Sequence, residues 1–187
     1  LQTLVVALFG TGMANLLNKW MLSGSVLTKN VVAPKGPFVD AITTPAVTVA
    51  KAGIVTWANI IALETAVQKK HMPVTGTSGF VCSTSMLAEL RTTLKSANVA
   101  GYIAESVGKG TWEIDGYPVF VSEDVDDNTI EFGVFEYDLL GQFGTVRMII
   151  DPYTDAKKNI TRFVFHTRWD NVVLRPEAFA ALVRATV

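Results

Sequence analysis

The sequence predicts an α+β protein in which helices come first and a mostly antiparallel sheet, flanked by these helices, follows. Two observations support this prediction. Apolar residues recur at helical spacing in the first half of the chain, whereas beyond residue 110 they alternate with polar residues as they do in strands. The chain of 187 residues is also long enough for one main domain with a substantial core.

The amino-terminal part predicts one long helix and then an irregular connection. Over residues 4–21, apolar side chains form two rows four positions apart, which is the spacing of a helix face. Gly10 and Gly12 weaken the middle of this helix. Residues 26–53 contain several prolines, so we expect only short extended pieces there.

A second helix is expected after Thr56, which is a suitable N-cap, and it begins with Trp57. Pro73 prevents its continuation. Positive charge in the last turn of a helix stabilises the helix, because it interacts with the negative end of the helix dipole. The basic residues expected in that turn are Lys69, Lys70 and His71.

Residues 80–82 predict a short apolar strand, and the polar residues 83–85 can cap a third helix after it. The apolar residues of this helix at core spacing are Met86, Leu87, Leu90 and Leu94. The glycine-rich residues 101–110 then predict a loop.

The second half of the chain predicts a series of strands. Residues 112–114 and 117–121 flank Asp115 and Gly116, a pair that favours a tight turn, so we expect a hairpin. The further strands are expected over residues 130–135, 145–150, 160–169 and 172–174.

The carboxyl end predicts a short closing helix over residues 176–182. Pro176 suits the first position of a helix. Phe179 is the largest apolar side chain of the segment, so we expect it to pack this helix against the rest of the protein.

The composition favours burial of apolar surface between subunits. Hydrophobic residues make up 49% of the chain and charged residues only 18%. The most apolar stretch, residues 1–22, is interrupted by polar residues, so we expect no membrane span. It has no basic flank before it and no clear small-residue cleavage site after it, so we expect no signal peptide. Because the chain begins with Leu1 and not methionine, we expect that a further portion precedes it.

The net charge and the cysteine count exclude further classes of function. The formal net charge is −1 and no segment carries a dense basic patch, so specific nucleic-acid binding is not indicated. The single cysteine, Cys82, excludes an internal disulfide framework and suits a reducing cytoplasm. Because its neighbours are apolar, we expect it to be a buried hydrophobic residue.

The sequence contains no recognisable catalytic constellation, and we expect no enzyme activity, cofactor or metal. The only histidines are His71, at a helix end, and His166, on the polar face of a strand. The acidic residues 123–127 do not match a calcium loop and are expected to form a solvated turn. An enzyme that uses His166 with Asp170 is the alternative of another class.

Several segments, in order, resemble the HK97 family of phage capsid proteins. Residues 163–179 resemble its terminal signature, in which a long strand leads into an apolar pair and then Pro-Glu-Ala-Phe. Residues 112–119 are similar to its strand pair with Gly and Pro-Val, and residues 130–135 to its short Phe-Gly strand. Residues 57–97 resemble its helix, strand and capped second helix. The resemblance covers residues 40–184.

This resemblance implies a major capsid protein that assembles into pentamers and hexamers of an icosahedral shell around double-stranded DNA. It implies a partial peripheral domain with the spine helix over residues 1–42, an axial domain over 43–151 and a peripheral return strand with a closing segment over 152–187. The implied location is the virion, after assembly in the host cytoplasm. The implied partners are other copies, portal and scaffolding proteins and packaged DNA bound non-specifically, with no membrane.

Two other readings of the resemblance stay open: an encapsulin-like compartment shell, which encloses cargo protein, and another virion component such as a decoration or tail protein. The expected structural or assembly residues are Trp57, Trp112, Gly116, Pro118, Trp169, Pro176 and Phe179.

Overall fold

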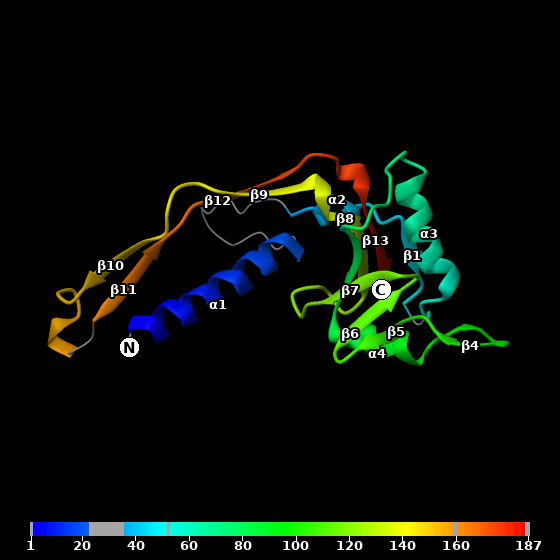
Figure 1. Ribbon diagram of the computed structural model, residues 1–187, viewed down its shortest axis with the longest axis horizontal. Coiled ribbons are helices and arrows are strands. Elements are labelled where there is room, and N and C mark those ends of the chain that lie inside the picture. The colour runs from blue at the N-terminus through cyan, green and yellow to red at the C-terminus, as the bar shows by residue number, and fades with distance from the viewer. Residues whose placement is uncertain (1, 23–35, 52, 159–160, 186–187) are drawn as a thin grey trace.

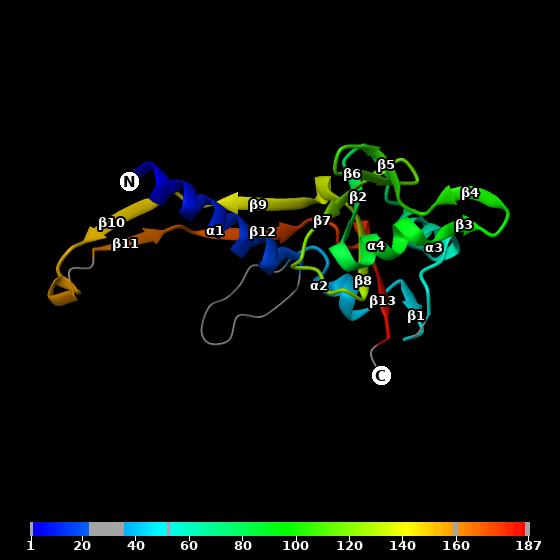
Figure 2. The same cartoon turned by 90° about the horizontal axis from the view of Figure 1, so that it is seen from below.

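The computed structural model describes residues 2–22, 36–51, 53–158 and 161–185. The molecule is elongated, with a compact body and an extended arm that leaves it at one side (Figure 1). We call residues 36–137 and 174–185 the body and residues 138–173 the arm. Helix α1 (Gln2–Leu22) runs beneath the arm and confirms the predicted first helix (Figures 1 and 2).

The body is built on a seven-stranded mixed sheet with the order β1-β13-β8-β2-β7-β6-β5. The strands, from one edge to the other, are β1 (Val47–Val49), β13 (Phe179–Arg184), β8 (Thr129–Val134), β2 (Ser78–Cys82), β7 (Tyr117–Val121), β6 (Thr111–Ile114) and β5 (Glu105–Gly108). β8 pairs antiparallel with both β13 and β2, whereas β1–β13 and β2–β7 are parallel pairs. The centre of the sheet therefore joins three distant parts of the chain.

The core lies on both faces of this sheet, because every residue of β8 is buried. On one face, the ring of Phe132 lies 4.6 Å from Phe80 and 5.5 Å from Tyr117, measured between centroids. On the other face, Phe179 packs edge-to-face with Phe38 at 5.3 Å. Alternate residues of a strand point to opposite faces, which explains this division.

Helix α3 (Trp57–Gln68) begins where the sequence predicts it, after Thr56 in extended conformation, and it packs against β13 and β8. It ends before the predicted basic turn, so the placement of Lys69, Lys70 and His71 in its last turn was wrong. His71 has a φ of 61°, and this left-handed conformation reverses the chain before Pro73.

Helix α4 (Thr84–Thr92) is capped as predicted, with Ser83 Oγ accepting a hydrogen bond from the Met86 amide at 3.2 Å. The expectation that Leu94 belongs to its core face was wrong, because the chain turns into the hairpin β3 (Leu94–Ser96) and β4 (Val99–Tyr102) and leaves Leu94 exposed. The predicted loop over residues 101–110 was also wrong, since it contains the end of β4 and all of β5.

The predicted hairpin of β6 and β7 is confirmed, with Ile114 opposite Tyr117. Asp115 and Gly116 have φ values of 51° and 80°, as a two-residue turn of type I′ requires. The connection before α3 is less irregular than expected, because it contains the short helix α2 (Val39–Thr43) as well as β1.

The predicted closing helix was wrong. Pro176–Ala178 form a single 3-10 turn, and Phe179–Arg184 form β13 between β1 and β8. A short apolar run fits a helix or a buried strand equally well, and here the two neighbouring strands offer hydrogen bonds on both sides.

The arm consists of two two-stranded ribbons, which follow one another outward from the body (Figure 2). Near the body, β9 (Asp138–Gln142) pairs with β12 (Trp169–Val173), and farther out β10 (Arg147–Asp151) pairs with β11 (Arg162–His166). The strand predicted at 145–150 is confirmed as β10. The strand predicted at 160–169 contains β11, but it is interrupted after His166 and its last residue begins β12; residue 160 lies outside the described residues. The strand predicted at 172–174 belongs to β12, and β9 was not predicted.

Candidate functional site

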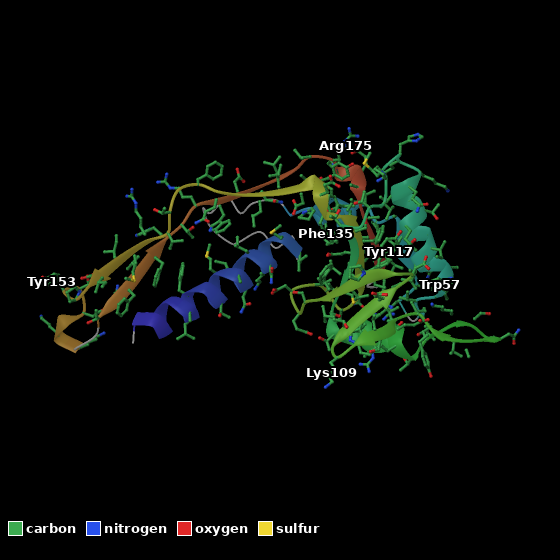
Figure 3. All side chains as sticks on the ribbon, in the orientation of Figure 1. Trp57, Lys109, Tyr117, Phe135, Tyr153 and Arg175 are labelled. Atoms are coloured by element: carbon green, nitrogen blue, oxygen red, sulfur yellow. The ribbon has the colours of Figure 1, made fainter. Side chains whose placement is uncertain are left out.

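Two of the candidate tryptophans lie on the body, each beneath a basic side chain. Trp57 is half-buried at the start of α3, with Lys95 Nζ 4.8 Å from its ring centroid (Figure 3). Trp112 is half-buried in β6, with Arg91 Cζ 4.0 Å from its ring centroid. Cation–π contacts of this kind stabilise by about 0.5–1 kcal/mol at exposed sites. Each of the two contacts joins two elements of the same subunit.

Gly116 and Pro118 belong to the β6–β7 hairpin. A Cβ at Gly116 would meet nothing within 4 Å, so its positive φ of 80° is what favours glycine there. Pro118 is exposed in β7, opposite Glu113 of β6.

The remaining three candidates follow one another along the return of the chain to the body. Trp169 is half-buried at the start of β12, and its Nε1 is buried without a hydrogen-bond partner among the described residues. Pro176 is exposed in the 3-10 turn. Phe179 is buried, as expected, but it packs a strand and not a helix.

The structure does not bring the seven candidates together into one site. Among the described residues, neither His166 with Asp170 nor His71 forms a catalytic arrangement. His166 is exposed on the arm, and no hydrogen bond or ion pair joins it to Asp170 within the described residues. His71 is exposed in a turn. In the part of the chain that the structure describes, no three His, Cys, Asp or Glu side chains are placed to hold a metal ion.

The strongest electrostatic perturbations lie inside the body. Burial, with a smaller contribution from the charge of Asp115, raises the pKa of Glu64 from 4.5 to about 7. Burial also raises the pKa of Glu131 well above its ordinary value, and no partner for either of its oxygens is found among the described residues. Burial and then Glu131 raise the pKa of the Cys82 thiol to about 12, so Cys82 is a buried hydrophobic residue as predicted.

The arm concentrates exposed apolar side chains. Its large apolar side chains with at least a third of their surface exposed are Leu139, Leu140, Phe143, Val146, Met148, Ile149, Ile150, Tyr153, Val164 and Val172. Tyr153 lies near the tip of the arm and is 85% exposed (Figure 3). A two-stranded ribbon in water is only marginally stable and presents unpaired backbone groups on both edges. Such a surface can bind protein by packing and strand pairing, and it has no chemistry for catalysis.

The prediction from sequence missed this surface. It identified the strands of the outer ribbon but divided them between the two implied domains at residue 151, so it did not recognise them as one exposed arm. The one usable signal is the apolar run at residues 148–150, which is apolar on both faces and therefore does not suit a ribbon exposed to water.

Among the described helices, none combines the length and apolar character needed to cross a membrane.

Three comparisons place the chain among known proteins. It matches the phage capsid family over residues 1–183. No curated protein sequence matches it significantly. Its fold is similar to the capsid protein of a native GTA particle computed with C5 symmetry, with a TM-score of 0.74, 19% identity and coverage of 100% of this chain and 72% of the other.

Two further solved structures share the fold. The protein from Microbacterium phage Oxtober96 has a TM-score of 0.74 and 16% identity, with 99% of this chain and 66% of the other covered. The SrpI encapsulin of Synechococcus elongatus PCC 7942 has a TM-score of 0.63 and 16% identity, with 95% and 63% covered. The chain thus spans about two thirds of the length of these proteins. Because the family match extends over almost its entire length, the chain belongs to the phage capsid family and is a shell-forming structural protein with the HK97 fold.

Proposed function

We propose that the chain is part of the major head protein of a tailed phage or prophage, and that it assembles into pentamers and hexamers of an icosahedral shell around double-stranded DNA. The observation that carries this proposal is the arm, whose apolar side chains and open strand edges need a protein partner. Since the shell consists of many copies of one chain, the nearest available partner is another copy.

We assign the axial domain to the body and the peripheral domain to α1 and the arm. This assignment differs from the boundaries at residues 43 and 151 that the sequence suggested, because β9 and β10 lie in the arm and β13 lies in the central sheet. The axial domain would then be discontinuous in sequence, with the arm inserted between β8 and β13.

Portal and scaffolding proteins are further partners in this proposal, contact with packaged DNA is non-specific, and assembly takes place in the host cytoplasm. A net charge of −1 supports weak, non-specific contact with DNA, since tight binding would need a clear excess of positive charge.

An encapsulin-like compartment shell is the second candidate, and the similarity to the SrpI encapsulin favours it. The two functions use the same fold and differ in what the shell encloses.

Electron microscopy of the complete gene product, expressed alone in bacteria, tests the proposal together with light scattering on the same sample. We expect closed shells, or rings of five or six subunits. A stable monomer or dimer would contradict the proposal. Shells that contain a defined cargo protein and no nucleic acid, when isolated from the natural host, would instead support the compartment shell.

A further inference from the structure

The outer face of the arm carries a basic hollow at the bend between its two ribbons. The hollow is lined chiefly by Phe143, Thr145, Arg147, Ile149, His166 and Arg168, with no acidic residue among its walls. Arg147 and His166 lie directly opposite one another in β10 and β11, so their side chains share one face. Arg168 continues the ladder across the bend, since its carbonyl accepts a hydrogen bond from the Phe143 amide at 2.9 Å.

This hollow faces away from α1. The ring of Phe9 in α1 stacks on Phe165 with centroids 3.9 Å apart and planes 15° apart. Phe165 and His166 are adjacent in β11 and therefore point to opposite faces of the ribbon. Helix α1 thus covers one face of the arm, and the face with the hollow has no cover among the described residues.

The basic groups of the hollow have no acidic partner. Arg147, His166 and Arg168 are all exposed, and none forms an ion pair in the described part of the chain. Their apolar neighbours Phe143 and Ile149 are 63% and 51% exposed. The combination of cations with an apolar wall suits an acidic protein segment better than the continuous phosphate backbone of DNA.

The body carries a matching acidic loop at residues 122–128, between β7 and β8. Its four carboxylates are Glu123, Asp124, Asp126 and Asp127, and the loop contains no basic residue. Within the described residues none of the four forms an ion pair with a basic side chain. Arg184 lines the same depression but pairs with Glu89, and Glu123 accepts a hydrogen bond from the Thr84 amide at 3.3 Å. The loop therefore presents net negative charge at the surface of the body.

The acidic loop cannot fill the basic hollow of its own subunit. Glu123 and Asp124 share a surface depression with Leu22, at the carboxyl end of α1. Phe9, which marks the position of the arm, is thirteen residues earlier in the same helix, or about 20 Å away at 1.5 Å per residue. Helix α1 runs along one side of the arm (Figures 1 and 2), and the hollow lies on the opposite face of the ribbon.

We propose that the acidic loop of one subunit docks into the basic hollow on the arm of a neighbouring copy. The two surfaces differ, so the contact is heterologous, and repetition of a heterologous contact generates rings when its rotation closes. Complementary charge fixes the relative orientation of the two copies, and the apolar wall supplies burial. This inference rests on the proposed function, because it names the contact between shell subunits.

Charge reversal on each side, alone and combined, tests the inference in the complete gene product. The variant Arg147→Glu/Arg168→Glu should yield at least about tenfold fewer shells or rings, because four carboxylates would then meet two more. The variant Asp126→Lys/Asp127→Lys should reduce the yield of shells or rings to the same extent. The two pairs combined in one chain should recover assembly, because the charges are again complementary.

The matched control is Lys157→Glu/Lys158→Glu, which makes the same change of charge elsewhere on the exposed outer part of the arm. It should assemble as the wild type does. Thermal unfolding should be unchanged in the arm variants, because every substituted side chain is exposed. Asp126→Lys should lower it only slightly, because it removes one exposed hydrogen bond, from the Asn128 amide to the Asp126 carboxylate.

The outcomes separate the two levels of the proposal. If the wild type forms no particles, the proposed function fails. If the wild type and both reversed variants assemble equally, or if the combined variant is not rescued, only the docking inference fails. Normal shells that contain less nucleic acid in the Arg147→Glu/Arg168→Glu variant would overturn it in favour of DNA contact.

Discussion

At the scale of single residues, Gly133 and Phe179 pack closely in the body. The two residues lie opposite each other in β8 and β13. A Cβ at Gly133 would lie 2.3 Å from Cδ1 and 2.7 Å from Cε1 of Phe179, which is far inside van der Waals contact. Phe179 is held by Phe38 on the same face, so its ring has little room to move.

We therefore expect Gly133→Ala to destabilise the protein by about 1–3 kcal/mol through overpacking, as judged by urea unfolding. Gly76→Ala is the control, because a Cβ there meets nothing within 4 Å. Equal unfolding midpoints for the two variants would show that the Phe179 ring can move to accommodate the added methyl group.

Glu64 makes stability depend on pH. Its pKa is raised by burial from 4.5 to about 7 in the folded protein, so the folded state holds the proton more tightly than the unfolded state. The corresponding stabilisation is complete below about pH 4.5 and is lost as the pH rises through about 7. The buried Glu131 acts in the same direction.

We expect Glu64→Gln to be more stable than the wild type at pH 8 by about 1–3 kcal/mol and nearly equal to it at pH 4, because the amide has no charge to bury. Urea unfolding at the two pH values measures this difference. Glu136→Gln, at an exposed carboxylate, should show no such change between the two pH values. If Glu64→Gln raised the free energy of unfolding by the same amount at both pH values, the raised pKa of Glu64 would be contradicted.

At the scale of elements, an ion pair joins α4 to β13. Arg184 Nη2 lies 2.6 Å and 2.7 Å from the two carboxylate oxygens of Glu89, and Glu89 Oε1 also accepts a hydrogen bond from the Val55 amide at 3.2 Å. One side chain thus connects the helix, an interior strand of the sheet and the connection before α3. Both partners are mostly buried, so solvent screens the pair little.

We expect Glu89→Ala to cost about 2–4 kcal/mol, because it leaves a largely buried guanidinium and a backbone amide without their acceptor. Glu105→Ala removes a 2.7 Å ion pair with Lys95, but Glu105 is 56% exposed, so its loss should cost less than about 1 kcal/mol. Chemical denaturation of both variants provides the comparison. Similar losses of unfolding free energy would show that the Glu89–Arg184 pair stabilises the protein no more than an exposed ion pair does.

At the scale of the whole molecule, the arm depends on α1. The described contact between them is the stack of Phe9 on Phe165, and the outer ribbon has no other sheet to pair with among the described strands. The arm in an isolated subunit should therefore be less stable than the body.

We expect Phe165→Ala to speed amide hydrogen exchange in β10 and β11 by about tenfold and to leave β8 unchanged, because an aromatic stack contributes about 0.5–1.5 kcal/mol beyond its buried area. Val164→Ala, on the opposite face of β11, is the control and should change exchange much less. Uniform exchange changes across the body would show that the arm and body unfold together.

The sequence by itself determined the elements that depend on local signals. The Asp115–Gly116 turn and the Ser83 cap of α4 involve only residues a few positions apart, so their physical causes can be read from the chain. The start of α3 was placed correctly, although the Thr56 side chain forms no capping hydrogen bond. The resemblance to capsid proteins also depends on ordered local segments, and it correctly indicated the family.

Only the tertiary structure decided the roles of segments whose local signals were ambiguous. Residues 179–184 have an apolar pattern that suits a helix or a strand, and their hydrogen bonds to β1 and β8 select the strand. Leu94 has helical spacing but lies beyond the end of α4. The arm is exposed because its ribbons leave the sheet after Tyr137 and return at β13. The paired residues of β9 and β12 are 27 to 35 positions apart, so local propensity cannot assign them.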